Sequence, residues 1–497
     1  MVKLSERKNI ISRFTEWLDE NFGFTKTILR PAPEYSLRNP SYWLGAIAVI
    51  AFFTAGIAGI ILLQYYEPHP DTAWESVSRI ITEVPYGNLI RNIHIYSAFS
   101  MIFVTFLHFM RNYFVVAYKR PRELMWIVGM LMGLATLMMG FTGYLLPWYA
   151  LSYAAVGFGI TIVKHLPQPL SGFLEYIISG YGTDVELLRR FYTFHTVLLP
   201  AVIIILLAIK LHIFEVHGIT EPLSKDIPEE EKKLIPWFPN IFFYFVILVC
   251  VYLASILTAS IIYPFGIHEK YIPGVVTIPM PEWYFMWTYA IAKTEFIEVL
   301  GETGFKIFIA TLVIITLIFV FLPFIDKWKD KHPSQRPFFI AIGVWIVVQI
   351  FLMTYLAWVT AGSYIPSDVA ILSIVIPTII IFLAAYIYQL KLVKPPELVW
   401  EKFSKLKITK LEKRSPHPKE YIWTSLKFLL TMMCAGLSFR IIYGSLTKSL
   451  GFGWLIFGLA LLTFSTIESF KVIYVADLKT GNVGRRLRSF ERWVGVG

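Results

Sequence analysis

Long apolar stretches separated by short polar segments run through most of the chain. A membrane-spanning helix needs about 20 predominantly apolar residues, and ten stretches meet that requirement. They cover residues 42–65, 93–118, 124–146, 193–216, 240–263, 305–325, 338–360, 367–390, 421–443 and 452–475. The pattern predicts an all-α, polytopic transmembrane helical bundle of about ten spans, with the lipid bilayer as its surroundings.

The composition supports a location in a membrane. Hydrophobic residues make up 56% of the 497 residues and charged residues only 16%, whereas a soluble domain has roughly 25% charged residues. The N-terminus carries no short apolar stretch ending in a small-residue cleavage site, so we expect no removable signal peptide. Cys250 and Cys434 lie in separate apolar stretches, so we expect neither a disulfide nor a thiolate metal site.

The net charge of +11 is distributed unevenly among the loops. Basic residues concentrate at 116–124, 326–337, 391–420 and in the tail, whereas the loops at 66–89, 147–188, 264–304 and 361–366 are neutral or acidic. Basic loops mark the cytoplasmic side of a membrane. The distribution predicts a protein of the cell membrane with both termini in the cytoplasm, and it gives no indication of a nucleic-acid partner. The acidic loop at 217–237 is an exception, and acidic residues count little in this rule.

Three boundaries divide the chain. Residues 5–30 alternate charged and aromatic residues at near-helical spacing, as in a helix lying on a membrane surface. The polar loop at 217–237 separates four spans from the next four, and a basic stretch precedes the last two. The expected regions are a surface-helix segment at 1–40, a four-helix bundle at 41–220, a four-span part at 221–390, a basic linker at 391–420, and two extra spans with a basic tail at 421–497.

Four of the ten histidines lie within or at the edge of apolar spans: His94 and His108 in the second, His195 and His212 in the fourth. A polar ring in a span is costly and usually functional, although a lone one can simply hydrogen-bond a neighbouring helix. His94 and His108 are 14 residues apart, about 21 Å of rise and nearly four full turns, so they share one face. The second and fourth spans run in the same direction, which pairs His94 with His195 and His108 with His212. Two stacked pairs suit bis-histidine ligation of two haems in a four-helix core.

The fourth histidine fits this arrangement least well. His212 follows His195 by 17 residues rather than 14, which adds about 4.5 Å of rise and about 60° of rotation in an ideal helix. Pro200 lies between them and could kink the helix or introduce over-length turns. Lys210 is the only other basic group nearby, and we do not expect an amine to ligate haem iron.

Glycines and arginines near these histidines suit a tetrapyrrole. Glycine lets a large ring approach a helix backbone, and four glycines repeat the 14-residue step. They are Gly45 and Gly59 in the first span and Gly129 and Gly143 in the third. Arg91 and Arg111 each lie one turn from a histidine, His94 and His108 respectively. They could pair with haem propionates, or simply extend to the membrane interface.

Several short motifs accompany the histidines. In order they are "PSYWLGAIAV", "AWESVSRIITEVPYGNLIRNIH", "RPRELMWIVGM", "GFTGYLLPW", "RRFYTFHTVLLP", "PEWY" and "RPFF". Together they resemble cytochrome b of the quinol-oxidising cytochrome bc-type complexes, over residues 10–390 or about three quarters of the chain. "RPREL" and the place of Pro200 resemble the relatives in photosynthetic complexes, which are split into two polypeptides, whereas both parts are fused here. The last two spans have no counterpart in the family pattern.

The resemblance implies a respiratory function. It implies that quinol is oxidised, with one electron passing to a Rieske iron–sulfur protein and on to a cytochrome or other carrier. The other electron crosses the membrane through two haems, of b type or a variant, to a quinone near the inner face, and protons are translocated. Relatives of this kind form homodimers.

The resemblance also implies roles for particular residues. Glu282 of "PEWY" would accept a proton from quinol, and Tyr284 would help to form the pocket; the alternative for Glu282 is a carboxylate that caps a helix. His217 would contact the inner quinone or lie solvated at the end of a span. Tyr149 occupies the place where relatives have a small or acidic residue at the mouth of the quinol pocket.

Two other functions remain open from the sequence. A membrane-anchor cytochrome b of a dehydrogenase would also use buried histidines, but would need neither "PEWY" nor a fused eight-span core. A proton-coupled secondary transporter could use the histidines as a proton relay. That class usually shows inverted internal repeats, and the sequence shows none.

Overall fold

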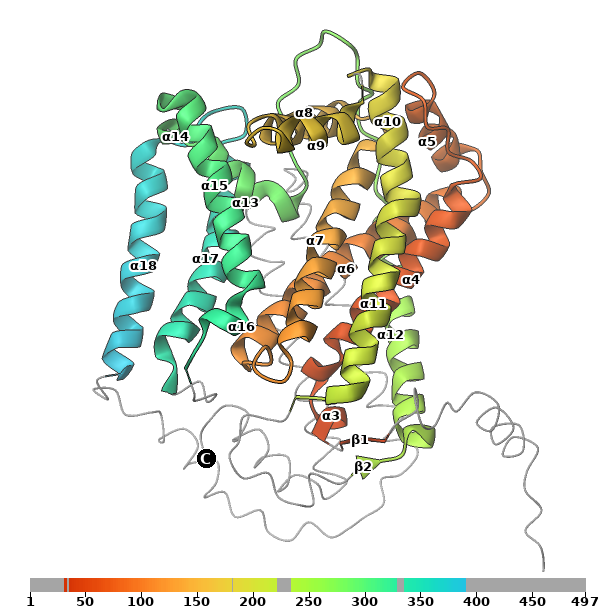
Figure 1. The fold of residues 1–497 in the computed structure, drawn as a ribbon. Helices are drawn as coiled ribbons and strands as arrows, with labels where there is room; N and C mark the ends of the chain where they lie inside the picture. Colours follow the sequence, from red (N-terminus) through yellow and green to blue (C-terminus); the bar gives the residue numbers. More distant parts are fainter. Residues whose placement is uncertain (1–30, 34, 181, 221–233, 329–334, 390–497) are drawn as a thin grey trace, which may run out of the picture.

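Eight long apolar helices make up most of the described molecule (Figure 1). The computed structural model describes residues 31–33, 35–180, 182–220, 234–328 and 335–389. The candidate membrane spans are Pro40–Leu62 (η1 and α4), Gly87–Phe114 (α6), Glu123–Leu145 (α7), Asp184–His217 (α10, η2 and α11), Phe242–Ile262 (α12), Gly301–Val320 (α15), Pro337–Val359 (α17) and Ser367–Gln389 (α18). The first eight predicted spans are therefore confirmed. The predicted surface helix, the basic linker and the last two spans lie outside the described residues.

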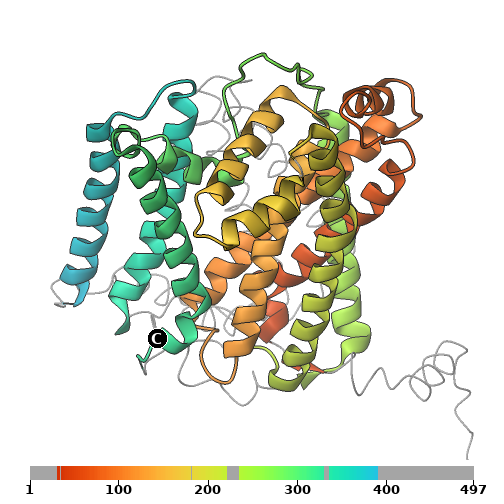
Figure 2. The ribbon, with the colours of Figure 1, turned by 45° about the horizontal axis from the view of Figure 1, so that its top comes forward.

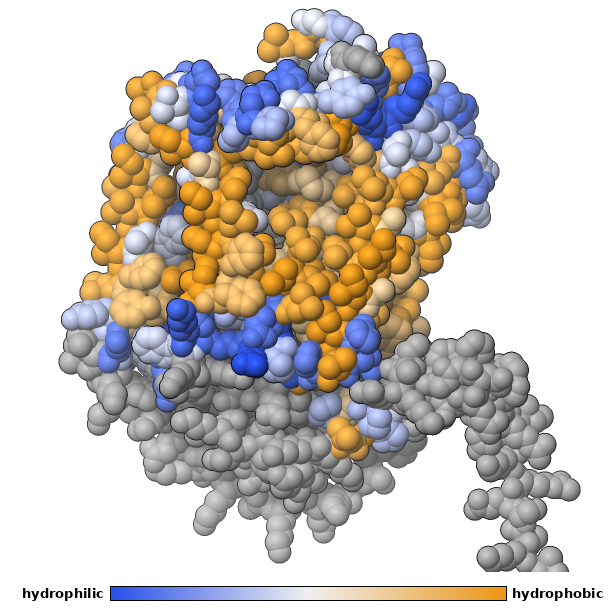
Figure 3. Space-filling model, viewed as in Figure 1, coloured by the Kyte–Doolittle hydropathy of each residue, from blue (hydrophilic) through white to orange (hydrophobic). Residues whose placement is uncertain are grey.

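The surface of these helices is suited to lipid. Figure 3 shows a broad hydrophobic band across the visible face of the helices, with polar residues gathered at both ends of it. Large apolar side chains such as Ile57, Val197 and Ile205 are 60% or more exposed. Exposed apolar area of this extent marks a membrane or protein contact, and with eight spans it makes the chain a multi-pass membrane protein.

The shorter elements lie at the two ends of the spans (Figure 1). One end carries α5, α8, α9 and α14, and the other carries α3, α16 and a two-stranded antiparallel sheet. Their bounds are Ala73–Thr82 (α5), Ala150–Lys164 (α8), Leu170–Ser179 (α9), Glu295–Val299 (α14), Tyr35–Arg38 (α3), Leu322–Ile325 (α16), Ala32–Pro33 (β1) and Leu234–Ile235 (β2). The register of the sheet pairs Ala32 with Ile235.

The spans form two groups, drawn in red to yellow-green and in green to cyan in Figures 1 and 2. In the first group, α4 packs against α6, α7 against α11, and α12 against both α6 and α4. In the second, the short helix α13 (Trp283–Ala292) packs against α17, and α17 against α18. The fifth span, α12, thus lies with the first four, and a buried cluster that includes Phe52, Met101 and Tyr252 holds it there.

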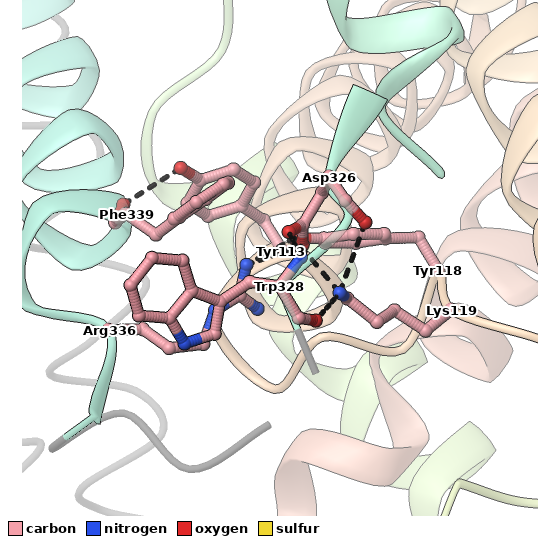
Figure 4. A network of polar contacts seen from close by, with 7 residues as sticks. All are labelled: Tyr113, Tyr118, Lys119, Asp326, Trp328, Arg336 and Phe339. Carbon is pink, nitrogen blue, oxygen red and sulfur yellow. Dashed lines mark hydrogen bonds and ion pairs between the residues drawn. The ribbon is translucent and has the colours of Figure 1, made fainter. Parts of the chain in front are cut away.

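A buried polar network joins the two groups at the end that carries the basic loops (Figure 4). The side chains of Asp326 and Arg336 are 0% and 1% exposed and form an ion pair. Tyr118, in the turn after α6, donates a hydrogen bond of 2.7 Å to Asp326 Oδ2, and Lys119 Nζ lies 3.2 Å from Oδ1. Burial by itself raises the pKa of Asp326, but the hydrogen bonds from Tyr118 and the Trp328 amide, with Arg336, outweigh it and lower that pKa overall.

Candidate functional site

His94 and His195 face each other across the first helix group. His94 lies on α6 and His195 in η2 (Phe194–Leu198), a π-helical turn, and their ring centroids are 6.0 Å apart. Nδ1 of His94 lies 2.8 Å from the Ala55 carbonyl oxygen, and Nδ1 of His195 lies 2.9 Å from that of Met139. Metal-ligating histidines commonly hold their other nitrogen in this way. With Nδ1 of each ring held by a carbonyl group, the two rings would offer their Nε2 atoms to a metal such as haem iron.

A glycine stands behind each of these rings. A Cβ on Gly59 of α4 would lie 3.1 Å from His94 Cε1, and a Cβ on Gly143 of α7 would lie 2.5 Å from His195 Cε1. Side-chain carbons are rarely tolerated at such separations without movement. We expected these glycines to make room for a porphyrin; the structure shows that they make room for the imidazoles.

His108, one of the two remaining predicted ligands, lines a large cavity. Its volume is about 1640 Å³, and residues of α4, α6, α7 and α11 form much of its wall. A Cβ on Gly45 would lie 3.2 Å from His108 Cε1. Nε2 of His108 lies 3.1 Å from Asn112 Nδ2, and its Nδ1 is buried with no hydrogen-bond partner among the described residues. A buried ring nitrogen without a partner is costly, which fits a site that receives a bound group.

The structure does not bring His212 to this cavity. His212 is exposed on α11 (Leu199–His217) and is absent from the cavity wall, whereas Lys210 and Gly129 both line it. His217, at the end of α11, lines the same cavity. Of the four predicted ligands, the structure therefore assembles His94 with His195 and places His108 in a cavity wall that also includes Lys210.

The two predicted propionate partners differ in their surroundings. Arg111 lines the cavity, with its guanidinium 4.2 Å over the ring of Tyr42. Arg91 is buried and donates hydrogen bonds to the carbonyl oxygens of Phe265 (2.8 Å) and Gly266 (3.2 Å). Arg91 thus holds the loop after α12 to the start of α6, a role that sequence reasoning missed.

Tyr149 also takes part in holding this loop. Its hydroxyl accepts a hydrogen bond of 3.0 Å from Arg91, and its ring packs edge-on against His268 at 5.1 Å. Tyr149 and Lys270 form an isolated antiparallel bridge. The residue that departs from the family pattern is therefore a buried bracing residue of the loop.

Glu282 is half-buried and immediately precedes α13. Burial raises the pKa of Glu282 to about 7, against the opposite effect of the Trp283 amide. Its side chain makes no capping hydrogen bond to the helix, so the geometry does not favour a helix cap. The Tyr144 hydroxyl, at the end of α7, donates a hydrogen bond of 2.9 Å to the Met280 carbonyl oxygen. This bond ties the segment before Glu282 to the residue next to Gly143, beside the His94–His195 pair.

Tyr284 is buried two residues further along the same segment. Its hydroxyl would lie 2.8 Å from a Cβ on Gly140 of α7, and its ring centroid is 6.4 Å from that of Phe99 on α6. The Trp283 ring packs edge-on against Phe99 at 6.3 Å. "PEWY" thus lies against α6 and α7 within an aromatic wall.

Comparisons with known proteins agree with this arrangement. Residues 99–269 match the family model described as cytochrome b (N-terminal)/b6/petB, and residues 276–382 match cytochrome b (C-terminal)/b6/petD. The chain is 30% identical over 351 residues to a "Cytochrome bc complex cytochrome b subunit" of Chlorobaculum thiosulfatiphilum, covering 68% of this chain and 79% of the relative. The chain belongs to the cytochrome b family.

Two further relatives extend the comparison. Cytochrome b6 of Heliomicrobium gestii is 37% identical over 213 residues, which is 42% of this chain and 100% of the relative. A solved structure titled "Hyperthermophilic respiratory Complex III" shares the fold with a TM-score of 0.61 and 25% identity, and covers 75% of this chain and 98% of its own. The chain is thus a cytochrome b of a bc-type complex, an oxidoreductase subunit of respiratory electron transport. Membership of this family decides against the membrane-anchor and transporter alternatives.

Proposed function

We propose that this cytochrome b is the dihaem, quinol-oxidising subunit of its complex. The observation that carries the proposal is the facing of His94 and His195 at 6.0 Å, with Nδ1 of each ring held by a backbone carbonyl group. Two haems bound in the first helix group would supply one-electron centres at two depths. His94 and His195 would hold the outer one, His108 would supply a ligand to the inner one, and Arg111, which lines the same cavity, would offer a positive charge to its propionates.

The residues around "PEWY" manage the proton chemistry. Glu282 accepts a proton from a quinol hydroxyl group as the quinol loses its electrons, and then releases that proton towards the outside. Because its pKa is about 7, both protonation states of Glu282 are populated near neutral pH, which suits a group that takes and gives protons in turn. Tyr284 and its aromatic neighbours form one wall of the pocket and exclude water. His217, at the opposite end of the cavity, contacts the quinone that is reduced near the inner face.

The proposal extends to partners and location. A Rieske iron–sulfur protein accepts the first electron of each quinol on the outer side and passes it to a downstream cytochrome or other carrier. The complex is a homodimer in the cell membrane, with both termini of this chain in the cytoplasm. The alternation of basic and neutral loops supports this orientation.

Haem analysis of the purified chain tests the proposal. We expect two haems per chain by pyridine haemochrome assay, both reduced by added quinol. His195→Leu should remove about half of the haem, while His165→Leu, at a half-buried position just after α8, leaves the content unchanged. A chain that binds no haem, or two haems that quinol does not reduce, would overturn the proposal.

A further inference from the structure

We propose that Lys210, and not His212, provides the ligand opposite His108 at the inner haem. The proposal rests on the dihaem function above and concerns the fourth ligand position. Three lines of geometry support it: the glycine partners of the ligands, the register of α11, and the surroundings of the two candidate side chains.

At three positions a glycine of a neighbouring helix lies directly against the ring of a predicted histidine ligand. Gly59 faces the ring of His94, Gly143 that of His195, and Gly45 that of His108. A Cβ added to each of these glycines would lie 2.5–3.2 Å from Cε1 of the ring that it faces. The fourth glycine, Gly129, faces a lysine instead. A Cβ there would lie 2.9 Å from Lys210 Nζ. Lys210 therefore stands in the fourth equivalent place, on the same helix as His195 and towards the same neighbour, α7.

The π-helical turn explains why the lysine has this position. In η2 the Leu199 amide bonds to the Phe194 carbonyl oxygen, five residues back, so this turn holds one residue more than an α-helical turn. Lys210 follows His195 by 15 residues, and removing the extra residue leaves the 14-residue step found on α4, α6 and α7. That step ends about 40° short of four full turns, so Lys210 shares the face of His195.

The same count of residues along the helix places His212 on another face of α11. Two further residues add about 200° of rotation, which directs His212 to the opposite face of α11. That face is open: Ile205 is 60% exposed and Ile209 42% exposed, neither lines the cavity, and His212 is exposed as well. Lys210 and His108 both line the cavity of about 1640 Å³. Reaching it from His212 would require α11 to rotate by about half a turn against α7.

An amine can take this place chemically. The unprotonated amine of lysine has a lone pair on nitrogen, as the imidazole does, and metal ligands bind in their deprotonated form. Arginine offers no such lone pair, because its guanidinium stays protonated and has no acceptor. The exchange of lysine for arginine therefore separates ligation from a simple need for positive charge.

Spectroscopy of the full-length chain in its complex tests the assignment. In the wild type we expect two low-spin ferric haems, and near-infrared magnetic circular dichroism should show one with a histidine–amine charge-transfer band and one with a bis-histidine band. Two bis-histidine bands would overturn the proposal without any variant. A chain without haem would instead overturn the dihaem function itself.

Three variants sharpen the test. Lys210→Arg should convert one haem to high spin or lose it, whereas His212→Gln should leave both low-spin signals in place. Lys210→His should keep two low-spin haems and replace the histidine–amine band with a second bis-histidine band, which guards against a Lys210→Arg chain that fails to assemble. Retention of both signals in Lys210→Arg, or loss of one in His212→Gln, would overturn the proposal.

Discussion

At the scale of single residues, burial decides which ionisable groups can do chemistry. Glu282 is half-buried and precedes α13 without capping it. Loss of hydration disfavours the charged carboxylate, which raises its pKa to about 7. Glu298, in α14 of the same region, is exposed. Glu282 and Glu298, 16 residues apart, thus differ in their exposure to water.

Replacing Glu282 should slow quinol oxidation without loss of haem. A general base contributes about 10²–10⁴-fold to such a step, so we expect Glu282→Gln to reduce steady-state quinol oxidation by roughly that factor. Haem content and reduced-minus-oxidised spectra should match the wild type, and Glu298→Gln should retain full turnover. Normal turnover in Glu282→Gln would remove this residue from the proton path.

The pH dependence should follow the same group. Glu282 must be deprotonated to accept a proton, so below its pKa of about 7 the rate should fall about tenfold per pH unit, and above it the rate should level off. Measurement of kcat/KM for quinol between pH 5 and 9, with haem integrity checked at each pH, would show this limb in the wild type. The limb should be missing from the residual activity of Glu282→Gln; an identical limb in that variant would point to another titrating group.

At the scale of elements, close helix pairs set the places of the rings. α4 packs against α6 and α7 against α11, and the glycines on α4 and α7 let the histidines of their partners lie almost on the neighbouring backbone. Between the two pairs, His94 and His195 meet across the gap. The helices therefore act as two clamps, each made of a glycine helix and a ligand helix.

A methyl group on α7 should disturb the outer haem. A Cβ at position 143 would lie 2.5 Å from His195 Cε1, and forced overpacking costs about 1–3 kcal/mol, which corresponds to roughly a 5- to 150-fold loss in haem affinity. We expect Gly143→Ala to lose most of the outer-haem signal in redox-resolved spectra. Gly56→Ala, whose Cβ would meet no atom within 4 Å, should keep both haems. Equal spectra for the two variants would argue against the clamp.

At the scale of the whole molecule, the two helix groups depend on a few buried polar contacts. Asp326 lies between α16 and α17 and bonds to Tyr118 and Lys119 of the first group and to Arg336 of the second (Figure 4). Trp126 on α7 adds a hydrogen bond of 2.7 Å from its ring N–H group to the Phe319 carbonyl oxygen on α15. These contacts hold the basic-loop ends of the two groups together beside the cavity.

Removing the charge of Asp326 should destabilise the molecule. Asp326→Asn leaves Arg336 buried without its carboxylate, and breaking a buried pair in this way costs about 3–5 kcal/mol. Thermal unfolding in detergent, followed by circular dichroism, should show a clear fall in the melting temperature. Glu302→Gln, which breaks an exposed pair with Lys306, should leave it unchanged, and a similar small effect in both variants would contradict a joining role for the network.

The loss of stability caused by Asp326→Asn should depend on pH in a definite direction. Because the folded-state pKa of Asp326 is lowered, its contribution is present above the ordinary aspartate value of about 3.9 and is lost as the pH falls through the folded value. The difference in melting temperature between wild type and Asp326→Asn should therefore be largest near neutral pH and shrink in strong acid.

The sequence by itself determined the eight described spans, since each is a continuous apolar stretch and a backbone in lipid must satisfy its own hydrogen bonds as a helix. It also determined the shared face of His94 and His108, because a 14-residue step depends only on helix geometry. The family motifs supplied the oxidoreductase class. These features are local, so the order of residues is enough to establish them.

Tertiary structure decided the rest. The π-helical turn beside Pro200 changes the register of α11 and brings Lys210 to the cavity in place of His212, although the sequence suggested only that some over-length turn could occur there. Arg91 looked like a propionate partner from its spacing, but it bonds to a loop about 175 residues away. Asp326 lies beside lysines in the sequence, and its burial follows from its contacts with Tyr118, Lys119 and Arg336. Each outcome depends on which distant groups a side chain meets, and periodicity along one helix carries no information about that.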